Sequence, residues 1–164
     1  MKLPMVGLAT ILALIGLVLV LTALGPAQPV LSPDTRVAQP AKNLPPEVAS
    51  LAGVWEGARG QIFPSRLVVE KIHPEWASIL YAWQDDPNGQ FKAGWVRTRA
   101  KVLPGGTLHW RHPGDFTFEL SEDYTALVGK KNQAGRTITI VLHRSGPLVA
   151  SVGTDHLPLP GSPE

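Results

Sequence analysis

The feature that most constrains the fold is the regular alternation of short apolar runs and turn signals between residues 51 and 145. Runs spaced every eight to twelve residues are typical of an all-β sandwich or barrel. The breaks carry turn residues, as in Pro113-Gly114-Asp115. No stretch in this region shows a sustained helical period, so no long helix is expected. We predict eight strands, over 53–59, 66–72, 76–83, 94–103, 107–112, 116–120, 126–131 and 137–144.

Within most of these strands the apolar residues share one parity and the polar residues share the other. Each such strand therefore has one dry face and one wet face, as a closed antiparallel barrel requires. The strand at 66–72 is ambiguous, because Leu67-Val68-Val69 places apolar residues on both faces. The pattern is clear in the last strand, where Ile138, Ile140 and Leu142 alternate with Thr137, Thr139 and His143.

Two residues far apart in the sequence are expected to meet at one end of the barrel. Arg144 shares the parity of the apolar residues of the last strand, so its side chain points inward. The first strand opens with Gly53-Val54-Trp55. Because the first and last strands of a closed barrel are neighbours, we predict that Arg144 lies over the indole of Trp55. A cation–π contact of this kind contributes about 0.5–2 kcal/mol and would seal that end.

Gly53-x-Trp55 in the first strand, together with Arg144 closing the last, resembles the calycins: lipocalins, fatty-acid-binding proteins and avidin-like proteins. The resemblance covers residues 50–145. It implies an eight-stranded antiparallel up-and-down barrel that is closed at one end by Gly53, Trp55 and Arg144 and open to a ligand at the other. Avidin-like proteins hold biotin with an Asn and a Ser two and six residues beyond the tryptophan. This chain has Gly57 and Gln61 there, so biotin is not the expected ligand.

The chain begins with a segment typical of protein export. Lys2 precedes Met5 to Leu24, a run without charged residues. A cleaved signal peptide has an apolar core of about 7–15 residues, whereas a membrane-spanning helix needs about 20. We therefore expect residues 1–24 to form a signal anchor, with cleavage near Gly25-Pro26-Ala27 as the alternative. Lys2 orients the remainder outward, so we expect an inner-membrane-anchored domain in the cell envelope, or a secreted or periplasmic one after cleavage.

Proline-rich segments flank the predicted barrel. Residues 25–49 contain six prolines and few large apolar residues, so they bury too little surface to offset the entropy of ordering. Proline also stiffens a chain toward an extended form. We interpret 25–49 as a spacer between membrane and barrel. Residues 146–164 are expected to be a disordered tail, with docking of 148–152 as an edge strand the alternative.

Large aromatic residues supply a candidate binding site at Tyr81, Trp83, Trp95 and Trp110. They could line a small cup for an apolar or sugar-like ligand. The polar loop 84–90 is flanked by three of them and is the expected mouth. The alternative is that these aromatics form the core, as aromatics do generally. An eight-stranded barrel is largely filled by its own side chains, so any pocket should be small.

The sequence shows no recognisable catalytic or metal-binding motif. Cysteine is absent, which excludes disulfides, thiol nucleophiles and Cys-ligated zinc. Asp85 and Asp86 could be an acid–base pair or calcium ligands, but carboxylates in a Pro-Asn-Gly turn are typical of turn chemistry. His109 and His112 are expected to face opposite sides of a strand, so they cannot bind one ion unless the strand bends. We predict no catalytic residue, no metal and no cofactor.

Arg97, Arg99 and Lys101 form a basic stripe on the outer face of one predicted strand. A stripe of this kind could meet anionic lipid headgroups or an acidic partner. The alternative is an ordinary solvated strand exterior. The formal net charge of +2 is too small to indicate a nucleic-acid partner.

These observations favour an exported, membrane-tethered, non-catalytic barrel that binds a small apolar or sugar-like ligand. The first alternative is a structural or accessory module that contacts another envelope protein through its outer face. The second is a small hydrolase that uses the Asp85/Asp86 loop.

Overall fold

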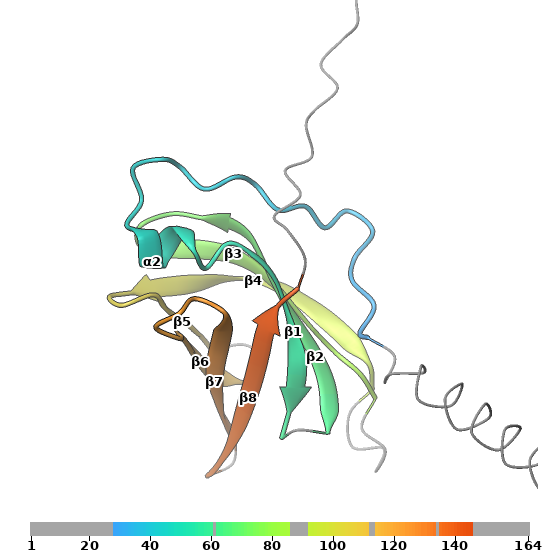
Figure 1. Cartoon of the computed structure of the whole chain (residues 1–164). Helices are drawn as coiled ribbons and strands as arrows, with labels where there is room; N and C mark the ends of the chain where they lie inside the picture. Colours follow the sequence, from blue (N-terminus) through green and yellow to red (C-terminus); the bar gives the residue numbers. More distant parts are fainter. Residues whose placement is uncertain (1–27, 61, 86–91, 112–113, 134, 146–164) are drawn as a thin grey trace, which may run out of the picture.

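A computed structural model describes residues 28–60, 62–85, 92–111, 114–133 and 135–145. In it eight antiparallel strands close into a barrel, in which each strand pairs with its neighbours along the chain and β8 pairs with β1 (Figure 1). This confirms the predicted all-β, eight-stranded up-and-down barrel. The described elements are α2 (Pro46–Ala49), β1 (Gly53–Arg59), β2 (Phe63–Ile72), β3 (Trp76–Trp83), β4 (Gly94–Leu103), β5 (Thr107–Trp110), β6 (Asp115–Leu120), β7 (Ala126–Gln133) and β8 (Arg136–Arg144).

The strand bounds differ from the predicted ones mainly at one end of the barrel. β2 begins at Phe63 and not at Arg66, because Pro64 pairs with Ala58 at the end of the strand. Proline lacks an N–H and is tolerated at strand ends. The short helix α2 lies inside the segment expected to be a spacer. The predicted anchor at 1–24 and the tail at 146–164 lie outside the described residues.

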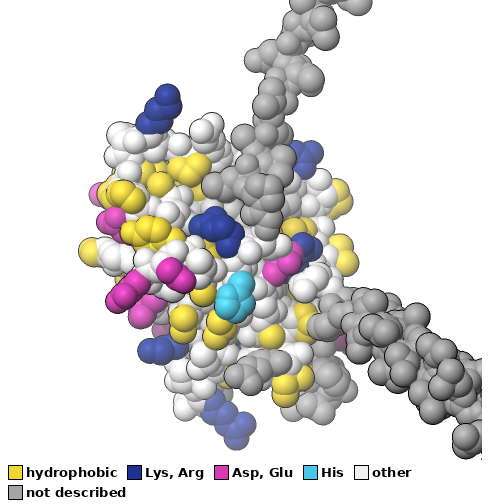
Figure 2. All heavy atoms as spheres, viewed as in Figure 1, with side chains coloured by type: hydrophobic (Ala, Val, Ile, Leu, Met, Phe, Trp, Pro, Cys, Tyr) yellow, Lys and Arg dark blue, Asp and Glu magenta, His cyan; other side chains and the backbone are white. Residues whose placement is uncertain are grey.

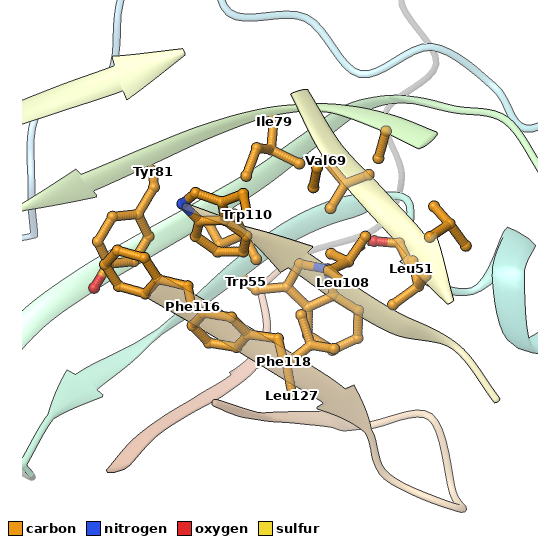
Figure 3. Packing of buried hydrophobic residues seen from close by; sticks show 14 of the residues in the cluster. Leu51, Trp55, Val69, Ile79, Tyr81, Leu108, Trp110, Phe116, Phe118 and Leu127 are labelled. Carbon is orange, nitrogen blue, oxygen red and sulfur yellow. Dashed lines mark hydrogen bonds between the residues drawn. The ribbon is translucent and has the colours of Figure 1, made fainter. Parts of the chain in front are cut away.

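Aromatic side chains fill the middle of the barrel. The Trp110 ring stacks on Phe116 and Phe118, with centroids 4.8 and 5.4 Å apart. Figure 3 shows this group extending from Tyr81 on one side to Trp55 on the other. Aromatic rings bury more apolar surface than any other side chains, and the interior of an eight-stranded barrel is just wide enough for them.

The end of the barrel at which β1 begins and β8 ends, here called the α2 end, is closed. The Trp55 side chain is fully buried there, and its Nε1–H donates to the Leu51 carbonyl over 2.9 Å. The Arg144 guanidinium carbon lies 4.2 Å from the Trp55 ring centroid. Its nitrogens donate to the carbonyls of Ala52, at 3.0 Å, and of Ser50. The predicted contact between Trp55 and Arg144 is confirmed.

Residues 28–38, here called the strap, pack along the outside of β2 and β3 (Figure 1). Outward-facing Val68 and Leu80 are fully buried, and Leu31 and Val37 of the strap pack against them. The Ala38 amide donates to the Glu70 carbonyl over 2.7 Å. This docking was not expected from a proline-rich spacer. It explains why the strand at 66–72 is apolar on both faces: the barrel core covers one side and the strap covers the other.

Ion pairs also hold the strap in place. Arg97 on the outer face of β4 pairs with Asp34 of the strap at 3.1 Å and with Glu70 of β2 at 2.9 Å. The next cation of the basic stripe, Arg99, lies over the Trp76 ring at 4.3 Å. The stripe is therefore not simply a solvated surface, because Arg97 meets acidic groups of its own chain.

The strap should open without the barrel unfolding when its apolar contact is lost. We expect Val37→Asp to raise the hydrogen-exchange rate of the Ala38 amide about tenfold or more, because a charged side chain cannot remain against Val68. Amides of β6 and β7, which are not neighbours of β2 or β3 in the barrel, should keep their rates. Exchange followed by NMR measures both. Equal acceleration throughout the barrel would contradict an independently docked strap.

The Asp34–Arg97 contact should weaken in acid. The Arg97 guanidinium, with a smaller contribution from the Ser32 hydroxyl, lowers the pKa of Asp34 from 3.8 to about 2. Because the pKa of Asp34 is lower in the docked strap, its ion pair with Arg97 stabilises docking fully at pH values above 3.8. That stabilisation is lost as the pH falls through about 2. NMR titration of the Asp34 carboxyl carbon should give this midpoint. In Arg97→Gln the midpoint should rise toward 3.8, and identical midpoints in the two proteins would contradict the assignment.

Candidate functional site

The structure brings together three of the four aromatic residues predicted to form a mouth. Tyr81 and Trp110 are buried, and Trp83 is half-buried with its ring 6.0 Å from that of Tyr81. Trp83 also donates its Nε1–H to the Lys92 carbonyl over 2.7 Å. Trp95 does not join them. It is 46% exposed on the outer face of β4, because Val96 has the parity that points inward.

Polar groups lie among these aromatics, at the end of the barrel where β1 ends, here called the Arg59 end. The Tyr81 hydroxyl donates to Ser65 Oγ over 3.2 Å, and Ser65 Oγ donates to the Phe63 carbonyl over 3.3 Å. Burial raises the pKa of the Tyr81 hydroxyl above its ordinary value, so the group is neutral at physiological pH. Trp110 Nε1 is buried and has no acceptor among the residues that the structure describes.

Two cations also lie inside the barrel at the Arg59 end. Arg59 is 8% exposed, and its guanidinium carbon lies 5.1 Å from the Phe63 ring centroid. Lys131 is 5% exposed, and its Nζ lies 5.3 Å from the Phe116 ring centroid. Burial lowers the pKa of Lys131, and the positive charge of Arg59 lowers it further. Both cations also interact with other groups of the protein. Their charge and their burial are what set this end of the barrel apart.

Sequence reasoning missed Arg59 and Lys131, although a signal was present. Arg59 shares the parity of Trp55 and Gly57 in β1, and Lys131 shares the parity of Leu127 and Gly129 in β7. The same parity argument identified Arg144. For Arg59 and Lys131 the usual preference of charged strand residues for water favours the opposite, outward placement.

The structure describes some of the residues that were considered for acid–base or metal chemistry. The Asp85 carboxylate accepts the Ala93 amide over 2.6 Å and so holds the loop between β3 and β4. Asp86 and His112 lie outside the described residues. His109 bonds Asp115 through Nε2 at 2.8 Å. In the part of the chain that the structure describes, no three potential ligands gather in a metal-binding group.

No protein-family model, curated protein or solved structure matches this chain. Among the described residues, no helix has the length and hydropathy needed to span a membrane. Function therefore has to be inferred from the barrel itself, and above all from the difference between its two ends.

Proposed function

We propose that this protein is an exported, membrane-tethered, non-catalytic barrel of the calycin type, which binds a small ligand at the Arg59 end. One observation supports this most directly: the two ends of the barrel are built differently. The α2 end is closed by the Trp55–Arg144 contact. The Arg59 end instead holds a hydroxyl pair and two cations inside the barrel.

The contents of the Arg59 end fit binding better than packing. Burying polar and charged side chains costs free energy, and ligand sites are places where a few such groups stand among aromatic side chains. The interior of the α2 end needs one such group, Arg144, and two backbone carbonyls accept its hydrogen bonds. The interior of the Arg59 end carries the Tyr81–Ser65 hydroxyl pair and two cations, Arg59 and Lys131. Because Trp110, Phe116 and Phe118 fill the middle of the barrel, the site is shallow and its ligand small.

Trp83 is the side chain best placed to contact the apolar part of a ligand. It is half-buried beside Tyr81 on the inner face of β3, and Gly94 approaches its ring closely enough that an added Cβ would lie 3.2 Å away. The ring is therefore held at the rim of the barrel. Trp95 offers a matched control, because it is the adjacent β4 tryptophan and faces outward.

Fluorescent naphthylamine probes test this proposal. We expect the native protein to bind at least one of N-phenyl-1-naphthylamine and its 8-sulfonate. Trp83→Ala should weaken that binding about tenfold, because a large aromatic contact is lost. Trp95→Ala should change it by less than about twofold. The proposal fails if neither probe binds, or if the two variants weaken binding equally.

Export and tethering follow from residues 1–24 and are tested separately. We expect the protein in the membrane fraction, with its N-terminus intact on sequencing. A mature protein that begins near Gln28 would favour the cleaved alternative. A soluble cytoplasmic protein would refute both.

The second candidate function is an accessory module that contacts an envelope protein. The observation that favours it is an exposed apolar pair on the outer face, Val128 and Val141, which are cross-strand partners and 42% and 37% exposed. Figure 2 shows apolar groups and charges of both signs interspersed over one face of the molecule. Native mass spectrometry of protein purified from its host separates the two functions: a retained small molecule supports the first and a retained protein the second.

A further inference from the structure

Docking of the strap shortens the connection between the barrel and the apolar run from Met5 to Leu24. The strap begins at Gln28, and the sequence between it and Leu24 is Gly25-Pro26-Ala27. A connection of this length spans at most about 14 Å, even when it is fully extended. If the strap were free, the chain from Leu24 to Ala38 would span roughly 45–50 Å. With the strap docked, the barrel has to stay close to whatever holds the apolar run.

The strap meets the barrel near the Arg59 end. Arg66 Nη1 donates to the Pro29 carbonyl over 3.3 Å, whereas Ala38 is bonded further along β2, at Glu70. Arg66 pairs with Ala82 of β3, and Ala82 pairs with Trp95 of β4. Figure 1 shows the strap beginning beside the start of β4. The connection to the apolar run therefore leaves the barrel from the part of the Arg59 end that β1 to β4 form, here called the strap side.

Exposed apolar side chains are concentrated on this same side. Of the large apolar residues that the structure describes, the three most exposed are Val30 at 80%, Ile62 at 70% and Trp95 at 46%. Val30 follows Pro29 in the strap, Ile62 lies in the turn between β1 and β2, and Trp95 lies on the outer face of β4. Tryptophan is enriched where proteins meet the headgroup region of a bilayer. This surface is the part of the barrel best suited to contact lipid.

The exposed charges differ between the two ends of the barrel. The described carboxylates of the Arg59 end, Asp85 and Asp115, are bonded to the Ala93 amide and to His109. Exposed cations at this end are Lys92, Arg111 and Arg136. The hairpin loops of the α2 end, at 73–75, 104–106 and 121–125, contain no Lys or Arg, and their exposed carboxylates are Glu75, Glu122 and Asp123. Anionic headgroups attract the first set of charges and repel the second.

We propose that the barrel lies against a lipid bilayer with the strap side of its Arg59 end, through Trp95, Val30 and Ile62. The bilayer is the one that holds the apolar run, so this inference rests on the proposed tethering. The indole and the two aliphatic side chains enter the headgroup region, and Lys92 beside them meets anionic headgroups. The Arg59 end, where ligand binding is proposed, is then next to the lipid surface, and the closed α2 end points away from it.

Single labelled positions test this orientation, because the chain has no cysteine of its own. Full-length Ile62→Cys and Leu103→Cys are each labelled with bimane and reconstituted in vesicles of phosphatidylcholine and phosphatidylglycerol that contain a lipid with a nitroxide headgroup. Leu103 is exposed on the same outer face of β4 as Trp95, at the opposite end of the strand. We expect the nitroxide to quench position 62 about threefold more than position 103, because only position 62 lies at headgroup depth.

Substitutions in the labelled Ile62→Cys protein separate a specific contact from a short connection alone. Trp95→Ser should lower the quenching about twofold, because the indole no longer holds the barrel at the interface. Leu103→Ser is the matched control and should leave the quenching unchanged. Val37→Asp, which frees the strap, should lower the quenching at least as much as Trp95→Ser does, because a longer connection lets the barrel move away from the surface.

Flotation of the vesicles on a density gradient separates this inference from the tethering on which it rests. Protein that floats with the vesicles but is quenched equally at positions 62 and 103 overturns the lipid contact and leaves the tether intact. Quenching at position 62 that Trp95→Ser leaves unchanged overturns the role of that surface. Protein that does not float with the vesicles removes the proposed tether and the lipid contact together.

Discussion

Replacing Trp55 with alanine is expected to lower the free energy of unfolding by about 3–5 kcal/mol, the usual cost of removing a large buried aromatic side chain. Trp55 is fully buried, donates to the Leu51 carbonyl and carries the Arg144 guanidinium on its ring. Its loss leaves a cavity behind α2 and removes one face of the Arg144 site. Chemical denaturation followed by far-UV circular dichroism measures the change.

Two controls separate packing from the cation–π contact. Trp55→Phe keeps most of the apolar volume and should cost less than half as much. A double-mutant cycle of Trp55→Phe with Arg144→Met isolates the coupling between the two side chains, expected at up to about 2 kcal/mol. A loss of under about 1 kcal/mol in Trp55→Ala would show that the α2 end contributes little to stability.

Gly57→Ala should destabilise the barrel nearly as much as Trp55→Ala does. The reason is the opposite one, because this change adds an atom where there is no space for it. A Cβ at this position would lie 1.9 Å from the Val141 carbonyl oxygen and 2.9 Å from Leu142 Cα. Both atoms belong to the backbone of β8, so no side-chain rotation relieves the clash. β1 and β8 would have to separate where the barrel closes. We expect a loss of about 3 kcal/mol or more, at or above the upper end of ordinary overpacking costs.

Ala58→Ser provides the matched control for Gly57→Ala. Ala58 is the next residue in β1 and has the opposite parity, so a hydroxyl there should change stability by about 0.5 kcal/mol or less. Thermal unfolding compares the two variants. A Gly57→Ala protein as stable as Ala58→Ser would mean that β1 and β8 approach less closely than described.

The parts of the fold that were predictable from sequence are those set by strand parity. The contact between Trp55 and Arg144 needed only two things: that Arg144 face inward with Ile140 and Leu142, and that the first and last strands be neighbours. Both depend on a period of two and on closure of the sheet. The eight strands followed from the same alternation, and the errors in their bounds are confined to strand ends.

The strap could not be predicted, because its apolar residues are isolated. Leu31 and Val37 stand six positions apart in a polar, proline-rich segment, with no period to reveal a buried face. The receiving surface did leave a signal, the two-sided apolar run Leu67-Val68-Val69. That run showed that something covers the outside of β2, but not which segment of the chain does so.

The placement of the four aromatic residues was predicted in part. Tyr81, Trp83 and Trp110 lie together at one end of the barrel, as expected, whereas Trp95 shares the outward parity of Arg97 and was wrongly grouped with them. The inward placement of Arg59 and Lys131 was not predicted, because charged residues in strands usually face water. At both positions the strand parity predicts the observed inward placement, although burying a cation is unfavourable for folding.

The pairing of β8 with β1 also determines the order in which the molecule can be assembled. Seven strand pairs join neighbours along the chain, and hairpins of this kind form quickly because little loop entropy is lost. The remaining closure joins residues as much as 94 positions apart, as the bond from Arg144 to the Ser50 carbonyl does. A nascent chain can therefore pair β1 to β7 in turn, but it stays an open, curled sheet with two unpaired edges until the last strand emerges.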